Sequence, residues 1–255
     1  MANYNELILD RVRSLTAHDM GTGEMLFRLT SLEDPSLNTT AEGEEVVDAI
    51  GALITTLYRA KKAEFSASNS LLSLDLAAAQ FGAKKEVASE TDKIAVPTYE
   101  VLTVVDGKVT LSKEPVGEIK YIYELVNGGI ATRYAQSAAD GEAVFSIKGK
   151  EITVPEGVTG KIYVEYEFES AVANRIVNKT SEFPEACSMR IYAYFKDKCN
   201  ENIVYSGVIV ANKAKLNPES VELALTSTGK HPFSFQMMRD YCDEEAELFS
   251  IIVAE

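Results

Sequence analysis

The sequence GKIYVEYEFE, at residues 160–169, alternates between two kinds of side chain. One set is Ile162, Val164, Tyr166 and Phe168, and the other is Tyr163, Glu165, Glu167 and Glu169. Successive side chains of a β-strand leave opposite faces of a sheet, so this period of two predicts a strand with one buried face and one wet face. The chain is therefore built from sheets.

Further short strands with turn signals between them follow the same principle. Asp106-Gly107 and Asn127-Gly128 suit the positive φ angles of tight hairpins. Spacing of this kind favours an antiparallel sandwich or barrel over parallel βαβ units. The predicted strands are residues 23–30, 63–68, 99–105, 109–111, 119–126, 143–147, 152–154, 160–169, 189–195, 203–210, 221–226, 233–238 and 248–253.

Residues 44–62 carry the strongest helical pattern. Their apolar residues recur at a spacing near 3.6, Thr39 and Glu42 suit a capping box, and Lys61 and Lys62 suit the carboxyl end. We expect one amphipathic helix packed on a sheet here. The apolar positions are Val46, Val47, Ile50, Leu53, Ile54, Leu57 and Tyr58.

Two other segments have more than one interpretation. Residues 5–15 fit a short helix or an extended arm. Residues 69–82 alternate like a strand at their leucines, but Asn69 as a cap, an alanine run and Gly82 at the end favour a helix. Residues 84–93 are charged and poor in large apolar groups, which predicts an exposed connection and the best candidate boundary in the chain.

Composition limits the functions that the chain can have. Its 255 residues are 46% hydrophobic, which suffices for a sizeable core, and its net charge of -14 disfavours adhesion to nucleic acid or anionic membranes. No secretion signal and no apolar run of about 20 residues is evident, so we expect a soluble, unsecreted product. Cys187, Cys199 and Cys242 include no CxxC pair and predict reduced thiols.

Residue chemistry gives no sign of catalysis. His18 and His231 are the only histidines, neither has a metal-ligand neighbour at the usual spacing, and GxSxG and HExxH are absent. We therefore expect no enzyme, no catalytic residue, no metal site and no cofactor.

Three segments together resemble the tail-tube (major tail) proteins of tailed bacteriophages. They are residues 51–82, the sequence VTGKIYVEYEFES at residues 158–170, and residues 207–241. The resemblance implies a mainly β fold, an antiparallel β-sandwich or barrel with one packed amphipathic helix, as in phage tail tubes. Residues 1–95 and 171–255 would form this domain, with the helix near 44–62, and residues 96–170 an additional, inserted β subdomain.

The resemblance also implies a structural, non-catalytic function. Subunits would join sheets edge to edge into rings, usually hexamers, that stack as a tube in the virion tail. Partners would be other copies of the chain, other tail proteins and a sheath, without a membrane, after assembly in the host cytoplasm. DNA would be only passing cargo, repelled by an acidic channel. We hypothesise that Glu165, Glu167 and Glu169 face this channel; the alternative is that they keep the outer surface soluble.

Two alternative functions remain open from the sequence. The protein could be another phage structural protein, such as a head-tail connector or a capsid-associated subunit. It could also be a carbohydrate-binding or adhesion module with a β-sandwich fold. Such a module needs an exposed aromatic platform, whereas Trp is absent and packing within strands accounts for the many tyrosines.

Overall fold

Two compact units make up the chain in the computed structural model. Unit 1 comprises Met1–Lys85 and Ile176–Glu255, and unit 2 comprises Glu86–Arg175. Within them the structure describes residues 6–137, 144–200, 202–219, 221–226, 229–241 and 247–254. Cys242 lies outside these residues, and the two described cysteines, Cys187 and Cys199, are free thiols.

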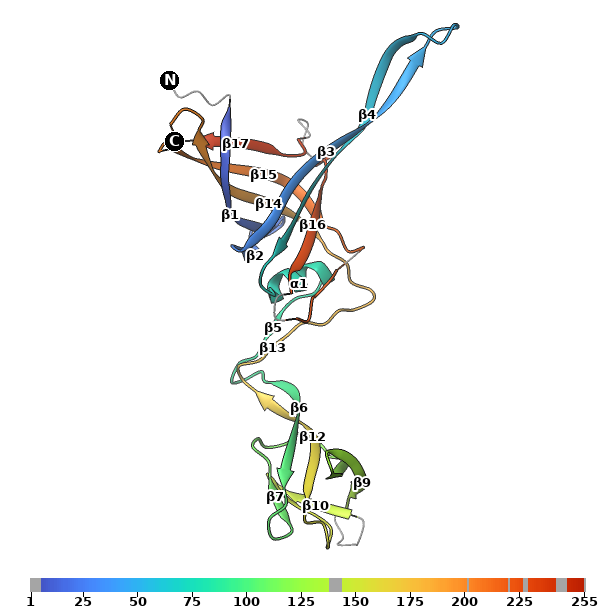
Figure 1. The fold of residues 1–255 in the computed structure, drawn as a ribbon, viewed down its shortest axis with the longest axis vertical. Coiled ribbons are helices and arrows are strands. Elements are labelled where there is room, and N and C mark those ends of the chain that lie inside the picture. The colour runs from blue at the N-terminus through green and yellow to red at the C-terminus, as the bar shows by residue number, and fades with distance from the viewer. Residues whose placement is uncertain are drawn as a thin grey trace. The chain divides into compact units, whose positions relative to one another are not determined.

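Unit 1 is an eight-stranded antiparallel sheet (Figure 1). The strand order is β2-β1-β14-β15-β16-β4-β3, with β17 also paired to β15, and β1 and β3 approach each other so that the sheet forms a nearly closed barrel. The mainly β, antiparallel prediction is confirmed for this sheet. Its strands are β1 (Leu7–Asp19), β2 (Met25–Leu29), β3 (Leu32–Val47), β4 (Leu53–Asn69), β14 (Ala186–Asp197), β15 (Val204–Leu216), β16 (His231–Met237) and β17 (Ser250–Ala254).

The predicted helix at residues 44–62 is wrong. This segment forms the end of β3, a turn, and the start of β4. Asp48 makes the turn, because its carboxylate accepts hydrogen bonds from the backbone N–H groups of Ile50 (2.9 Å) and Ala52 (2.8 Å), and Gly51 supplies a φ of +83°. The β-branched residues on either side then favour strands over a helix.

The helix among the described residues is α1 (Leu74–Phe81), which confirms the helical interpretation of residues 69–82. Its cap is Ser73, whose hydroxyl accepts from the backbone N–H of Leu76 at 3.2 Å, and not Asn69, which ends β4. Gly82 ends the helix at a φ of 67°.

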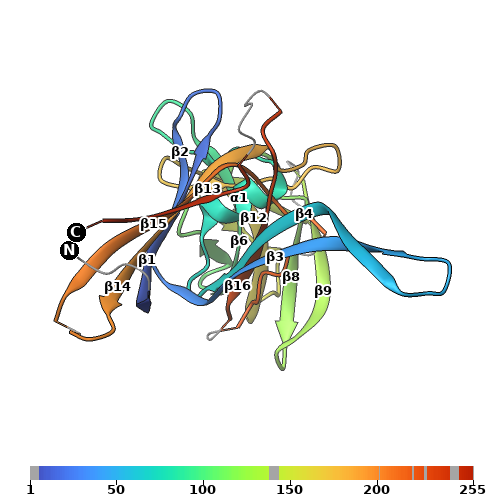
Figure 2. The same ribbon diagram turned by 90° about the horizontal axis from the view of Figure 1, so that it is seen from above.

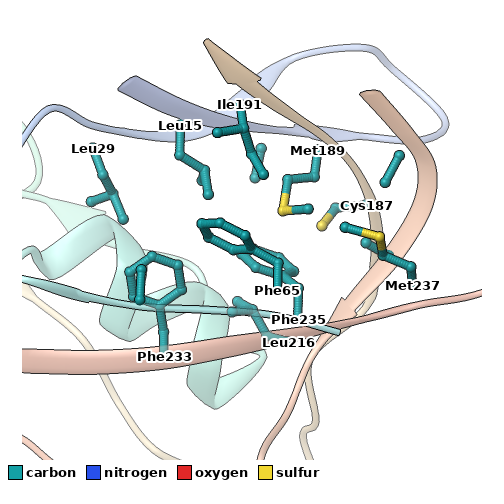
Figure 3. Packing of buried hydrophobic residues seen from close by; sticks show 14 of the residues in the cluster. Leu15, Leu29, Phe65, Cys187, Met189, Ile191, Leu216, Phe233, Phe235 and Met237 are labelled. Carbon is teal, nitrogen blue, oxygen red and sulfur yellow. The ribbon is translucent and has the colours of Figure 1, made fainter. Parts of the chain in front are cut away.

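One apolar cluster fills unit 1 (Figure 3). Strands from both halves of the chain contribute to it, and Leu76 of α1 is fully buried in it. The rings of Phe27 and Phe235 stack at 6.2 Å, and that of Phe233 meets Phe235 edge to face at 6.0 Å. The cluster joins segments that are far apart in the sequence, and its labelled members are Leu15, Leu29, Phe65, Cys187, Met189, Ile191, Leu216, Phe233, Phe235 and Met237.

Unit 2 holds a seven-stranded sheet in the order β6-β12-β8-β9-β10-β11-β7 and a separate pair, β13-β5. All its strand pairs are antiparallel except β9 with β10, and a second apolar cluster lies within it. The predicted hairpin turns are confirmed by positive φ at Asp106-Gly107 and Asn127-Gly128. The strands are β5 (Glu86–Val87), β6 (Ile94–Thr103), β7 (Lys108–Thr110), β8 (Tyr121–Val126), β9 (Gly129–Gln136), β10 (Val144–Lys148), β11 (Glu151–Thr153), β12 (Lys161–Ser170) and β13 (Asn174–Arg175).

Two further predictions have clear outcomes. Of the two interpretations of residues 5–15, the extended one is confirmed, because β1 runs along β14 and β2. The predicted strand at residues 221–226 is wrong, since that segment pairs with no described strand and Leu225 is 91% exposed.

Candidate assembly interface and acidic face

A two-stranded ribbon extends from the sheet of unit 1, and we call residues 40–62 the arm (Figure 1, Figure 2). Strand β4 pairs with β16 only through Ala63–Asn69. Beyond Ala63 its described partner is β3 alone, so the arm has no third strand beside it. An isolated pair of strands is at best marginally stable in water, so a further strand or surface packed against the arm would stabilise it.

A β-bulge lies where the arm leaves the sheet. The pairing changes from Thr40 with Lys62 to Glu42 with Arg59, so that two residues of β4 oppose one residue of β3. Ala60, one of the two, has a positive φ of 49°. Bulges bend a strand and increase its twist, so this one redirects the arm away from the sheet.

The arm exposes apolar side chains on both of its faces. Ile50 at the tip is 89% exposed, and Ile54 and Tyr58 are 64% and 74% exposed. Exposed ion pairs from Arg59 to Glu44 (3.4 Å) and from Lys62 to Glu42 (3.3 Å) cross the ribbon. Several large apolar side chains exposed on one short ribbon are typical of an interaction site. The exposed apolar residues of the arm are Val47, Ile50, Leu53, Ile54, Leu57 and Tyr58.

The glutamates at 165, 167 and 169, which we call the acidic row, lie on β12 as the sequence pattern predicts. All three are exposed, and Ile162 and Val164 of the same strand are fully buried. Glu169 pairs with Lys93 at 3.6 Å. Among the described residues, neither Glu165 nor Glu167 has a lysine or arginine within ion-pair distance.

A row of tyrosines shares this exposed face, although no local sequence pattern indicates it. The ring of Tyr163 stacks on Tyr99 of β6 at 5.5 Å and contacts Tyr123 of β8 at 6.3 Å. The Tyr163 hydroxyl donates to Glu165, and this hydrogen bond to a carboxylate raises the pKa of Tyr163 to about 12. Tyr121, with the Arg133 guanidinium 4.5 Å from its ring centre, extends the row, and we call Tyr99, Tyr163, Tyr123 and Tyr121 the tyrosine face.

A cavity of about 610 Å³ opens beside Tyr99. Glu118, Glu165 and Glu167 contribute carboxylates to its lining, with Pro97 and Val116 as apolar neighbours. The volume lies within the usual range of small-molecule sites.

Neither histidine belongs to the arm, the acidic row or the tyrosine face. Among the described residues, no three His, Cys, Asp or Glu side chains come together as a metal site, and no helix is long and apolar enough to cross a membrane. His18 contacts Thr16 at 3.1 Å near the β1–β2 turn. His231 is 2% exposed, and its Nε2 lies 2.6 Å from Oε1 of Gln80.

Acid is expected to destabilise unit 1 through His231. Burial lowers the pKa of His231, and the groups around it, Gln80 of α1 and Asn69 opposite on β4, carry no charge. Its Nδ1 has no partner among the described residues. The unfolded chain binds a proton near pH 6.5 and the folded chain only at lower pH, so the unfolding free energy falls as pH decreases through 6.5.

Urea unfolding at pH 7.5, 6.5 and 5.5 measures this dependence, and His231→Gln should flatten it. Because every other group is the same in both proteins, the difference between the two slopes isolates His231. Equal slopes would contradict the prediction.

These features describe a β-rich protein whose candidate functional parts are exposed surfaces. The family follows from comparison with known families: the chain belongs to the YomU/Tube protein family, whose model matches residues 7–251. The match covers nearly the whole chain and confirms the resemblance to phage tail-tube proteins. It suggests a structural, non-enzymatic component of a virion tail. No curated protein matches the chain.

Proposed function

We propose that the protein is a building block of a phage tail tube. Copies join into rings, six to a ring, and the rings stack as a conduit for DNA with other tail proteins, and in a contractile tail a sheath, around it. Assembly takes place in the host cytoplasm. The two units serve as separate domains, with the barrel of unit 1 forming the tube and unit 2 inserted between residues 85 and 176.

The arm is the observation that carries this proposal. It is a ribbon of 23 residues, 40–62, with apolar groups on both faces and no third strand beside it. Such a ribbon becomes stable when another copy of the chain covers it. When the contact joins two different surfaces, each copy can bind a further one in the same way, and the repeated contact builds a ring or a filament. The arm therefore favours a second copy of this chain as its partner.

The acidity of the chain supports passage of DNA through the assembly. With a net charge of -14, the repeated subunits surround the channel with negative charge, and phosphate groups are repelled. DNA then moves through without being held.

The acidic row has two proposed positions, the channel wall and the outer surface. A density map of the assembled tube distinguishes the two positions directly.

Electron microscopy of the purified protein at increasing concentration tests the proposed function. We expect discrete subunits at low concentration and stacked rings or hollow tubes at high concentration, since association follows mass action. Light scattering of the same samples gives the ring stoichiometry. A protein that stays monomeric over the whole concentration range would refute the proposal.

A further inference from the structure

The tyrosine face of unit 2 has the composition of a ligand-binding surface. Three rings, on β6, β12 and β8, contact one another across the sheet, and Tyr99 is 65% exposed. Exposed carboxylates of the acidic row stand on the same face of β12. Apolar ring surface and hydrogen-bond acceptors thus lie next to each other on one plane.

We propose that the tyrosine face binds a neutral carbohydrate. A pyranose ring has an apolar C–H face that packs on aromatic rings and hydroxyl groups that donate to carboxylates. Tyr99 and Tyr163 supply the rings, and Glu165 and Glu167 supply the acceptors. The cavity beside Tyr99 brings the same carboxylates, together with Glu118, to the edge of the face and gives a sugar chain room to continue.

Charge argues against the other partners that aromatic surfaces bind. Nucleic acid and acidic polysaccharides would meet the acidic row, and the basic residues beside the face, Lys161 and Arg133, form no ion pair with Glu165 or Glu167. An apolar protein surface would bury Glu165 and Glu167, which have no described cation partner, and burying a carboxylate unpaired is strongly unfavourable. A neutral polyol leaves the carboxylates hydrogen-bonded and wet.

The centre of the face is held in place before any ligand binds. Strand β12 pairs with β6 over Lys161–Ser170 and with β8 over Lys161–Val164, so the part that carries Tyr163 is held on both edges. The hydrogen bond from Tyr163 to Glu165 and the ring contact with Tyr99 fix the central side chain. A preformed site loses little entropy on binding.

This inference concerns unit 2 alone and does not require the tube. If the subunits assemble as proposed, weak sites repeated along the tube would act together and raise the overall affinity. A single site needs only modest affinity for that purpose.

The test uses the full chain, fluorescently labelled, on an array of neutral and acidic bacterial surface polysaccharides, followed by calorimetry with the oligosaccharides that bind. We expect neutral glycans to bind and Tyr99→Ala to weaken the binding about tenfold, because one aromatic contact is worth about one factor of ten. Tyr241→Ala is the matched control, since Tyr241 is an 85% exposed tyrosine in unit 1 and should leave binding unchanged.

Three results would overturn the inference: no glycan binding at all, binding of acidic glycans only, or binding of neutral glycans that Tyr99→Ala leaves unchanged. A polylysine probe on the same array tests whether the face binds a cationic peptide instead of a glycan. Binding of polylysine that is lost at high salt and in Glu165→Gln, together with no glycan binding, would contradict the inference. Labelled protein that forms no tubes can still bind the array. Electron microscopy therefore reports a failure of assembly, and the array reports a failure of glycan binding.

Discussion

The double substitution Ile54→Asp with Tyr58→Asp is expected to abolish assembly into rings and tubes. Both side chains lie on the exposed arm, at 64% and 74% exposure, and neither belongs to the buried clusters, so the subunit should fold normally. In an assembled interface, each new carboxylate would be buried without a partner. That penalty is several kcal/mol per charge and exceeds what the remaining contacts of the arm contribute.

Sedimentation velocity and negative-stain microscopy measure the outcome, with circular dichroism to confirm folding. The matched control is Leu225→Asp with Tyr241→Asp, which places the same two charges at an aliphatic residue and a tyrosine that are exposed elsewhere in unit 1, at 91% and 85%. The control should assemble like the unchanged protein. Tubes formed by the arm variant would show that the arm is not the interface.

The contrast between β12 and the arm shows which parts of this fold the sequence could predict. Strand β12 has one buried and one wet face, so its side chains alternate with period two and the strand is predicted within one residue. The turns at Asp106-Gly107 and Asn127-Gly128 could also be predicted from the sequence, because they depend on local backbone preference.

The arm was wrongly predicted as a helix because neither of its faces packs on the subunit's own core. With apolar residues on both faces there is no period of two, and the remaining spacing of Val46, Ile50 and Leu57 imitates a helix. The signals against a helix were local: Asp48 and Gly51, four and seven residues after the start of the segment, and the Ile54-Thr55-Thr56 run after them.

The tyrosine face could not be predicted from the sequence, for a different reason. Tyr99, Tyr123 and Tyr163 are separated by at least 24 residues, and their rings meet only because β12 lies between β6 and β8. Strand order is a non-local property that alternation within one strand does not contain. The chemistry of Glu165 was therefore recognised from the sequence, whereas its aromatic neighbours were not.

Phe235→Ala is expected to lower the unfolding free energy of unit 1 by about 3–5 kcal/mol. Phe235 is fully buried between Phe27 and Phe233, so its removal loses both ring contacts and leaves a cavity that the surrounding strands cannot close. Urea unfolding followed by circular dichroism gives the change in free energy. Hydrogen exchange read by mass spectrometry locates it, because β4, β16 and β1 should exchange faster.

Unit 2 provides the internal control for this substitution, since its own apolar cluster contains no residue of the first cluster. Exchange in β6, β8 and β12 should stay unchanged, and Phe235→Leu, which keeps most of the volume, should lose less stability than Phe235→Ala. Equal acceleration in both units would mean that they unfold together and would contradict two separate cores. A loss below about 1 kcal/mol would instead mean that the cluster collapses around the missing ring, contrary to the close packing of its aromatic side chains.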